Sequence, residues 1–213
     1  MGFNSYSQFG EDSILKGLMA KDGLHVENGG FYFDVGAHHP VRFSNTKIFY
    51  DFGWSGINID PNEGIKKKFE DIRPRDKTLE IALGKQNDVQ EFFTYDESAL
   101  NSLINRDEEL VDTQYFPSGS KMVQVATIKE ILNQFHKEDI PKPSFLDIDV
   151  EGHELEVLLG NDWNKYIFSY ILIEQKLTSL ETIQDCPVTI YLRDLGYKPM
   201  AYNGITTIFK HFS

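Results

Sequence analysis

The chain carries, at residues 31–40, the sequence Phe31-Tyr32-Phe33-Asp34-Val35-Gly36-Ala37-His38-His39-Pro40, an apolar run that ends at an acid and a glycine. A β-branched and aromatic run of this kind is typical of a strand buried inside a parallel sheet. Gly36 allows the backbone to turn sharply or to lie close to a ligand, because it has no Cβ. The stretch therefore predicts a buried strand that leads into a binding turn.

A second strand that ends in an acid follows, Gly56-Ile57-Asn58-Ile59-Asp60-Pro61-Asn62. In doubly wound sheets, ligands bind beyond the carboxyl ends of the strands, so Asp34 and Asp60 can share one nucleoside pocket. One acid can accept a hydrogen bond from the amino group of the ligand and the other from its ribose hydroxyls. The alternative is that each acid only caps the turn that follows it.

The glycine pattern argues against a phosphate-rich ligand. The turn at Gly36 has one glycine, so it is not G-x-G-x-x-G, and the chain has no G-x-x-x-x-G-K-[ST]. A pyrophosphate thus has no evident cradle. S-adenosylmethionine, a nucleoside without phosphates, suits one glycine and two acids better than NAD or ATP does.

Length and charge narrow the class of protein. With 213 residues, we expect one α/β domain over residues 1–213. The net charge of −12 disfavours nucleic acid and anionic membranes as partners. We expect no membrane insertion, because no apolar run approaches the roughly 20 residues that span a bilayer. The start of the chain lacks signal-peptide features, and the single Cys186 fits a reducing compartment, so we expect a cytoplasmic protein.

Hydrophobic periodicity and turn residues predict alternating strands and helices that finish in an antiparallel hairpin at Asn203-Gly204. This order describes an open, mostly parallel seven-stranded sheet with helices on both faces. We expect helices at 11–20, 46–52, 65–72, 127–135, 154–159 and 188–195, and strands at 31–35, 56–60, 77–83, 89–95, 122–126, 144–150, 170–174, 198–202 and 206–210.

Two segments outside this alternation are candidates for pocket walls. Residues 96–120 are polar and lack a clear period, and a loop of this length is often a lid or a substrate loop. In the N-terminal helical segment, residues 1–29, Gln8 and Gly10 precede the first helix. They suit a segment that packs over the cofactor side.

A second acidic stretch, Phe145-Leu146-Asp147-Ile148-Asp149-Val150-Glu151-Gly152-His153-Glu154, follows another predicted strand. Its three aspartate and glutamate residues at 147, 149 and 151 project to one face at period two, and they cannot all be buried without a cation or shared protons. Glu174 ends the next strand, so Asp149 and Glu174 can share one Mg²⁺ or Mn²⁺ ion. Alternatively, these acids cap helices and bind the ligand without a metal.

Three histidines lie near the predicted strand ends. His153 can act as the general base for a hydroxyl that such an ion orients, or it can be a surface residue on the first helical turn. We expect no catalytic role for His38 and His39, because a loop histidine is more often solvated or satisfied by the backbone.

These residues together resemble the FkbM family of S-adenosylmethionine-dependent methyltransferases. The resemblance covers about residues 6–176 and rests on the motifs Ser7-Gln8-Phe9-Gly10-Glu11-Asp12, Asp34-Val35-Gly36-Ala37-His38-His39-Pro40, Ser44-Asn45-Thr46, Gly53-Trp54-Ser55-Gly56-Ile57-Asn58-Ile59-Asp60-Pro61-Asn62, Ile148-Asp149-Val150-Glu151-Gly152-His153-Glu154 and Ile173-Glu174.

The resemblance implies a Rossmann-like class I methyltransferase domain, methyl transfer to oxygen and a carbohydrate acceptor. It places the cofactor at Asp34, Gly36 and Asp60 and a post-strand acid at Asp149. Relatives that act on sugars can need a divalent ion. We also expect cofactor contacts from a further set of residues, Gln8, Asn45 and Ala82.

The expected function is an O-methyltransferase that uses S-adenosylmethionine and acts on a sugar hydroxyl of a nucleotide-linked sugar or a surface-polysaccharide precursor. Asp149 and His153 are the expected catalytic residues, and a homo-oligomer is compatible with this function. The alternative from another class is a non-catalytic S-adenosylmethionine-binding subunit or sensor. An NAD-dependent sugar enzyme is disfavoured by the missing glycine pair.

Overall fold

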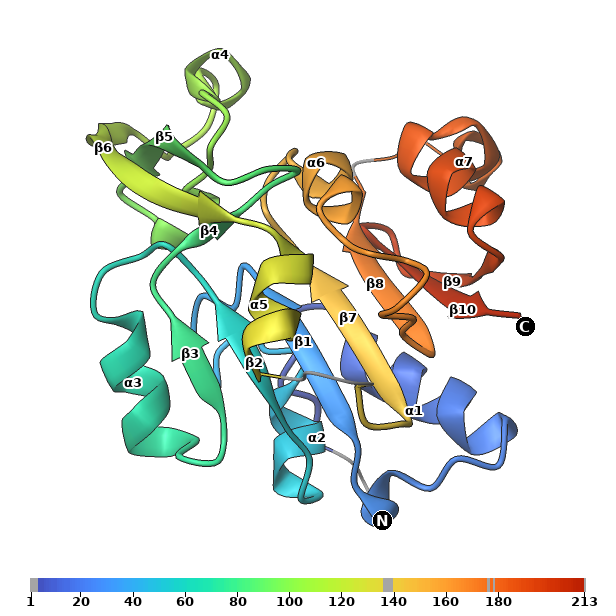
Figure 1. Ribbon diagram of the computed structural model, residues 1–213. Coiled ribbons are helices and arrows are strands. Elements are labelled where there is room, and N and C mark those ends of the chain that lie inside the picture. The colour runs from blue at the N-terminus through green and yellow to red at the C-terminus, as the bar shows by residue number, and fades with distance from the viewer. Residues whose placement is uncertain (1–3, 136–139, 176, 178, 213) are drawn as a thin grey trace.

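The computed structural model describes residues 4–135, 140–175, 177 and 179–212. A seven-stranded sheet forms its centre (Figure 1). In spatial order the strands are β3 (Lys77–Leu79), β2 (Ser55–Ile59), β1 (Phe31–Val35), β7 (Ser144–Ile148), β8 (Tyr170–Glu174), β10 (Thr206–His211) and β9 (Tyr197–Tyr202). The first five are parallel, and β10 runs antiparallel to both of its neighbours. The predicted mostly parallel sheet with a C-terminal antiparallel hairpin is confirmed.

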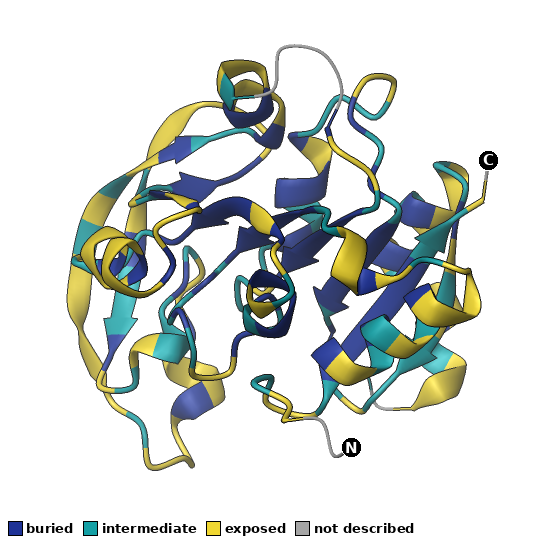
Figure 2. Cartoon of the chain, turned by 90° about the horizontal axis from the view of Figure 1, so that it is seen from below, coloured by how far each residue is buried: buried dark blue, intermediate teal, exposed yellow. Residues whose placement is uncertain are grey.

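Helices cover both faces of this sheet because its central strands are apolar on both sides. Every residue of β1 and β7 is buried, and the sheet forms the dark centre of Figure 2. One face packs against α5 (Ile128–Phe135), α6 (Glu154–Leu159) and α7 (Pro187–Asp194). The other packs against α1 (Glu11–Lys21) and α2 (Lys47–Asp51), and α3 (Ile65–Ile72) lies beside β3.

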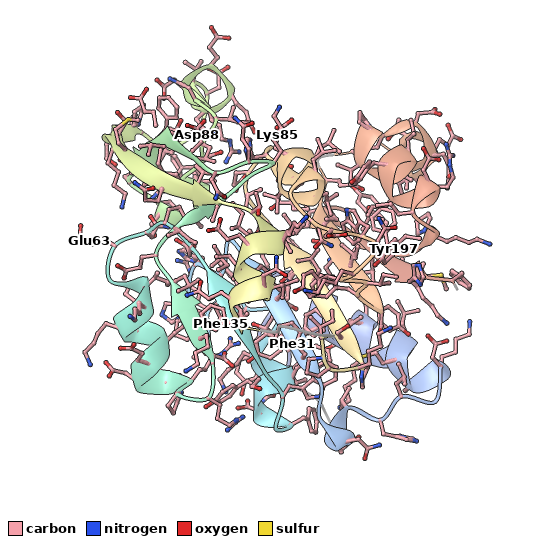
Figure 3. The ribbon with its side chains drawn as sticks, viewed as in Figure 1. Phe31, Glu63, Lys85, Asp88, Phe135 and Tyr197 are labelled. Atoms are coloured by element: carbon pink, nitrogen blue, oxygen red, sulfur yellow. The ribbon has the colours of Figure 1, made fainter. Side chains whose placement is uncertain are left out.

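Side chains follow the same division between core and surface. Phe31 and Tyr197 are buried in the core, at 3% and 1% exposure. Glu63, Lys85 and Asp88 are exposed, and Figure 3 shows them at the periphery of the molecule. Short 3-10 helices occur at η1 (Val26–Asn28) and η3 (Leu180–Asp185). None of the helices in the described residues has the length and apolar character that crossing a bilayer needs.

A second, three-stranded sheet corrects two of the expectations. Its order is β4 (Ala82–Leu83), β6 (Pro117–Ala126) and β5 (Asp88–Tyr95). The single strand expected at 77–83 is therefore two strands in two sheets, because β3 pairs with β2 whereas β4 pairs with β6.

The polar segment 96–120 also has more structure than expected. It contains the 3-10 helix η2 (Ser98–Leu100), the helix α4 (Asp107–Leu110) and the beginning of β6. Most of β6 is exposed, so the strand does not need the apolar alternation that would have revealed it.

The C-terminal hairpin forms where the Asn-Gly signal predicts it. Asn203 accepts hydrogen bonds through Oδ1 from the backbone N–H groups of Ile205 and Thr206, at 3.1 and 2.8 Å. The hairpin brings β10 beside β8 and places Thr206 opposite Glu174. The carboxyl end of β8 is thus enclosed within the sheet.

Candidate functional site

A cavity of about 480 Å³ lies at the carboxyl ends of the parallel strands. This volume falls within the range of about 300–1,000 Å³ that is usual for small-molecule sites. Its walls come from the turns after β1, β2 and β7, from the end of β8, from β4 and from Ile81, which directly precedes β4. Residues 97–103, Arg106 and the N-terminal residues Gln8, Phe9 and Glu11 complete the enclosure.

Gly36 sets the distance between two of these walls. Its φ is +84°, and a Cβ at this position would lie only 1.7 Å from the carbonyl oxygen of Asp149. The backbone N–H of Asp149 also donates to the carbonyl of Val35, at 2.9 Å. A glycine is therefore required where the turn after β1 lies directly against the chain after β7.

Asp60 is held by the backbone on both of its oxygens. Oδ1 accepts from the N–H of Asn62 at 2.7 Å, and Oδ2 accepts from the N–H of His38 at 2.8 Å. Burial nevertheless raises the pKa of Asp60. The structure thus shows the turn-capping role, and Asp60 also lines the cavity. Capping does not exclude a ligand contact, because each carboxylate oxygen has more than one lone pair.

Asp34 is 5% exposed and lines the cavity floor beside Asp147. The two residues lie opposite each other on the parallel strands β1 and β7. Burial raises the pKa of Asp34 to about 6, against the opposing hydrogen bond from Thr46. Burial, followed by repulsion from Asp34, also raises the pKa of Asp147 well above its usual value. Asn45 donates to Asp147 at 3.3 Å, so this predicted cofactor residue supports the acidic floor.

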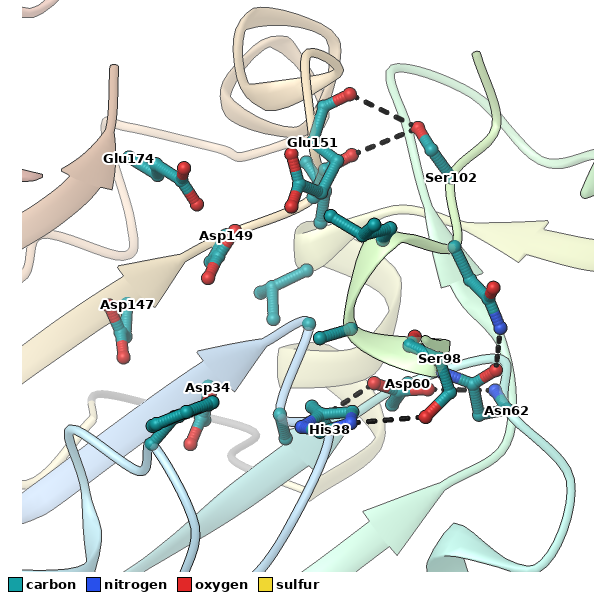
Figure 4. A pocket seen from close by; sticks show the side chains of 18 of the residues that line it. Asp34, His38, Asp60, Asn62, Ser98, Ser102, Asp147, Asp149, Glu151 and Glu174 are labelled. Atoms are coloured by element: carbon teal, nitrogen blue, oxygen red, sulfur yellow. Dashed lines mark hydrogen bonds between the residues drawn. The ribbon is translucent and has the colours of Figure 1, made fainter. Parts of the chain in front are cut away.

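Three carboxylates form a cluster next to this floor. Asp149, Glu151 and Glu174 each offer an oxygen within 4.8 Å of the others, and Figure 4 shows them at one end of a row of acids. Asp149 faces the cavity, and the cavity walls surround its carboxylate. Desolvation raises its pKa well above the usual value, and a hydrogen bond with Glu174 and repulsion from it add to the shift.

The cluster contains both predicted metal ligands, Asp149 and Glu174, and adds Glu151. The expectation that Asp147, Asp149 and Glu151 project from one strand face is wrong, because β7 already ends at Ile148. Glu151 instead reaches the cluster from a turn, with φ of +57°. Its carboxylate is paired with the guanidinium of Arg106, at 2.6 Å.

The three histidines near the strand ends differ in their positions and contacts. His153 lines the cavity at the start of α6, and burial lowers its pKa. It is not one of the three residues that form the acidic cluster in the described part of the chain. His39 accepts through Nδ1 from the N–H groups of Val41 and Arg42, at 3.1 and 3.0 Å. His38 lies 3.2 Å from the hydroxyl of Ser98.

The other predicted cofactor residues also line this cavity: Gln8 precedes α1, and Ala82 lies in β4. Sequence reasoning missed the polar anchors of the wall at 97–106. The hydroxyl of Ser102 lies 3.2 Å from the carbonyl oxygens of both Val150 and Glu151 and shares its one hydrogen between them (Figure 4). Asn101 donates to Asn62 at 2.6 Å. These partners lie 39–49 residues apart in sequence, so no local pattern reveals them.

Comparison with known proteins gives two findings and one negative result. A family model described as the methyltransferase FkbM domain matches residues 34–199. The crystal structure of a methyltransferase FkbM from Methylobacillus flagellatus KT is similar over 86% of this chain, with 14% identity and a TM-score of 0.48. The chain spans 44% of that solved chain. A search of curated proteins returns no match.

The family match includes most of the cavity. It runs from Asp34, at the end of β1, to Pro199 in β9, and thus contains the glycine turn, Asp60 and the whole acidic cluster. Since the match covers well over half of the 213 residues, the chain belongs to the methyltransferase FkbM family.

Proposed function

We propose that this protein is an S-adenosylmethionine-dependent O-methyltransferase that acts on a sugar hydroxyl. The acceptor is a nucleotide-linked sugar or a surface-polysaccharide precursor. Family membership supports methyl transfer, and such methyltransferases commonly use S-adenosylmethionine. The observation that carries the proposal is the single cavity in which the glycine turn and the acidic cluster meet.

The cofactor side of the cavity suits a cationic nucleoside. When bound, S-adenosylmethionine supplies an electrophilic methyl group on a positively charged sulfur. Asp34 and Asp147 form an acidic floor that favours positive charge, and Asp60 lies at the end of the next strand for the ribose hydroxyls. Gly36 allows the turn after β1 to lie directly against the chain at Asp149, because it has no Cβ to separate them.

The acceptor side has the oxygen ligands that Mg²⁺ or Mn²⁺ prefers. We propose Asp149 and Glu174 as ligands, with Glu151 as a third carboxylate beside them. Such an ion would lower the pKa of a bound hydroxyl. Crowding of the three acids supports this proposal. Desolvation is the largest cause of the raised pKa of Asp149, and repulsion from Glu174 and Glu151, which an ion would relieve, adds to it.

His153 is the proposed proton acceptor. Burial lowers its pKa, so the imidazole is neutral at pH 7 and can take a proton from the acceptor hydroxyl. Asp149 would hold the ion beside that hydroxyl. The chain otherwise acts by aligning the two reactants, which is the main requirement of a direct methyl transfer.

The walls complete the proposed arrangement within one domain over residues 1–213. Residues 96–120 would cover the acceptor, since Glu97, Ser102 and Arg106 already line the cavity. The N-terminal segment, residues 1–29, would pack over the cofactor side, where Gln8 and Glu11 reach the same space.

Binding is tested first, with S-adenosylhomocysteine in a thermal-shift and calorimetric series with and without Mg²⁺ or Mn²⁺. A ligand that prefers the folded state raises its stability, by about 2.7 kcal/mol at a concentration 100 times its Kd. We expect a shift with S-adenosylhomocysteine and a further shift with the metal that Asp149→Ala removes. Asp88→Ala, which changes an exposed acid outside the cavity, is the control.

Transfer is tested next, with labelled S-adenosylmethionine and a pool of nucleotide-linked sugars. We expect Asp149→Ala to lower turnover at least about 100-fold, whereas Asp88→Ala keeps it. Full turnover by Asp149→Ala refutes the roles given to the acidic cluster. Tight binding without transfer to any sugar would favour the non-catalytic binding subunit.

A further inference from the structure

A buried hydrogen-bond network lies directly behind the acidic floor of the cavity. Its centre is Arg73, whose side chain is 0% exposed. Arg73 donates through Nε to Asp76 at 2.8 Å, and through Nη2 to the hydroxyls of Tyr32 and Thr46, at 2.8 and 3.0 Å. Thr46 in turn donates to Oδ2 of Asp34 at 2.7 Å. The network therefore joins a buried cation to the acid on the cavity floor through one hydroxyl.

The geometry leaves the Thr46 hydroxyl one orientation. A hydroxyl has one hydrogen and two lone pairs, whereas a guanidinium can only donate. The Arg73 bond therefore fills a lone pair, and the single hydrogen points to Asp34. Ser44 lies 3.2 Å from the same oxygen and can fill the second lone pair. Thr46 is itself 0% exposed, so water does not compete for these positions.

We propose that Thr46 is a positioning residue for cofactor binding: supported by Arg73, it orients the Asp34 carboxylate toward the cavity and favours its ionised form. This inference rests on the proposed function, because it takes Asp34 as the residue that meets the cationic part of S-adenosylmethionine.

The charges around Asp34 explain why such support is needed. Asp60 on the β2 side and Asp147 on β7 both repel the Asp34 carboxylate. Below it, Arg73 stabilises the ionised form and Asp76 opposes it. Burial is the largest influence and raises the pKa of Asp34 to about 6, whereas the Thr46 hydrogen bond is the strongest influence that lowers it. Loss of that hydrogen bond raises the pKa further.

The test compares Thr46→Val with Thr46→Ser in calorimetric titrations with S-adenosylhomocysteine from pH 5.5 to 8.5. Valine keeps the shape of threonine and removes the hydroxyl, while serine keeps the hydroxyl. We expect Thr46→Val to bind on the order of tenfold more weakly at pH 8, as befits one lost hydrogen bond to a charged group. In Thr46→Val, the pH at which half of the affinity for S-adenosylhomocysteine is lost should move upward. Thr46→Ser should keep an affinity and a pH midpoint close to those of the wild type.

Thr189→Val is the matched control. Thr189 is also 0% exposed, it lies in α7 away from the cavity, and its hydroxyl has no hydrogen-bond partner among the described residues. This variant should bind S-adenosylhomocysteine as wild type does. If Thr46→Val does not fold, Thr46→Ala removes the same hydroxyl without steric conflict and carries the same expectations.

The outcomes separate this inference from the proposed function. Wild-type affinity and an unchanged pH midpoint in the hydroxyl-free variant overturn the inference alone. A uniform loss of affinity without a shift of the midpoint also overturns it, because a purely structural defect does not change the titration of Asp34. If the wild-type chain binds no S-adenosylhomocysteine at any pH, the cofactor assignment fails and the inference fails with it.

Discussion

Gly36→Ala should destabilise the fold through one identifiable contact. Alanine at this position must adopt a φ of +84°, which costs about 1–2 kcal/mol for a residue with a Cβ. Its Cβ would also lie 1.7 Å from the carbonyl oxygen of Asp149 and 2.8 Å from the carbonyl carbon. These are backbone atoms, so relief requires the two turns to separate. Overpacking of this kind adds about 1–3 kcal/mol. We therefore expect a total loss of about 2–5 kcal/mol in the free energy of unfolding.

Gly53→Ala isolates the steric part of this loss. Gly53 has a similar φ of +92°, but no described atom lies within 4 Å of a Cβ built there. It should lose only the conformational cost of about 1–2 kcal/mol. The measurement is urea unfolding of both variants, followed by tryptophan fluorescence, together with titration of S-adenosylhomocysteine. An equal loss of stability in both variants would show that contact with Asp149 is not what requires a glycine at position 36.

Three further substitutions test the buried polar groups and the core. Asp34→Asn should raise the free energy of unfolding by up to about 3 kcal/mol at pH 8 but not at pH 4. The raised pKa of about 6 means that ionisation of this acid costs free energy in the folded chain but not in the unfolded chain. The same variant should no longer bind S-adenosylhomocysteine. Asp76→Asn should instead lower the free energy of unfolding by about 3–5 kcal/mol, since it leaves buried Arg73 without its ion-pair partner. Urea unfolding of both variants at pH 4 and pH 8 checks that the two changes in stability have opposite signs at pH 8. Trp54→Phe should cost about 2 kcal/mol in the same assay, because it leaves a cavity and removes the 2.7 Å bond from Nε1 to the carbonyl of Val26; an unchanged midpoint would contradict the assigned role of this indole.

Local patterns predicted the sheet because its strands are short apolar runs with turn residues between them. The strands expected at 31–35 and 170–174 occur within those bounds, and so does the helix at 154–159. The same reasoning failed at 77–83 and at 117–121, where exposed or interrupted strands have no apolar alternation. In these segments, pairing with strands far away in the sequence decides the structure, and a local sequence pattern does not reveal that pairing.

In the candidate site, too, some features could be predicted from the sequence and others could not. The acids that end parallel strands could be found from sequence, because the carboxyl ends of adjacent strands meet at one edge of a sheet. Asp149 and Glu174 accordingly lie within one cluster. The partners that govern these acids could not be found in this way. Thr46 contacts Asp34 from 12 residues away, and Arg106 reaches Glu151 from another wall.

By itself, the sequence determined the type of fold, the strand ends that carry acids and the family resemblance, because these depend on residue type and short-range spacing. The glycine turn at residues 34–36 was visible in the same way. Only the tertiary structure decided why that turn needs a glycine, which acids share a cluster and which hydrogen bonds orient them. These properties depend on distances between segments far apart in the chain, such as the close approach of Gly36 to Asp149, and those distances exist only after the chain has folded.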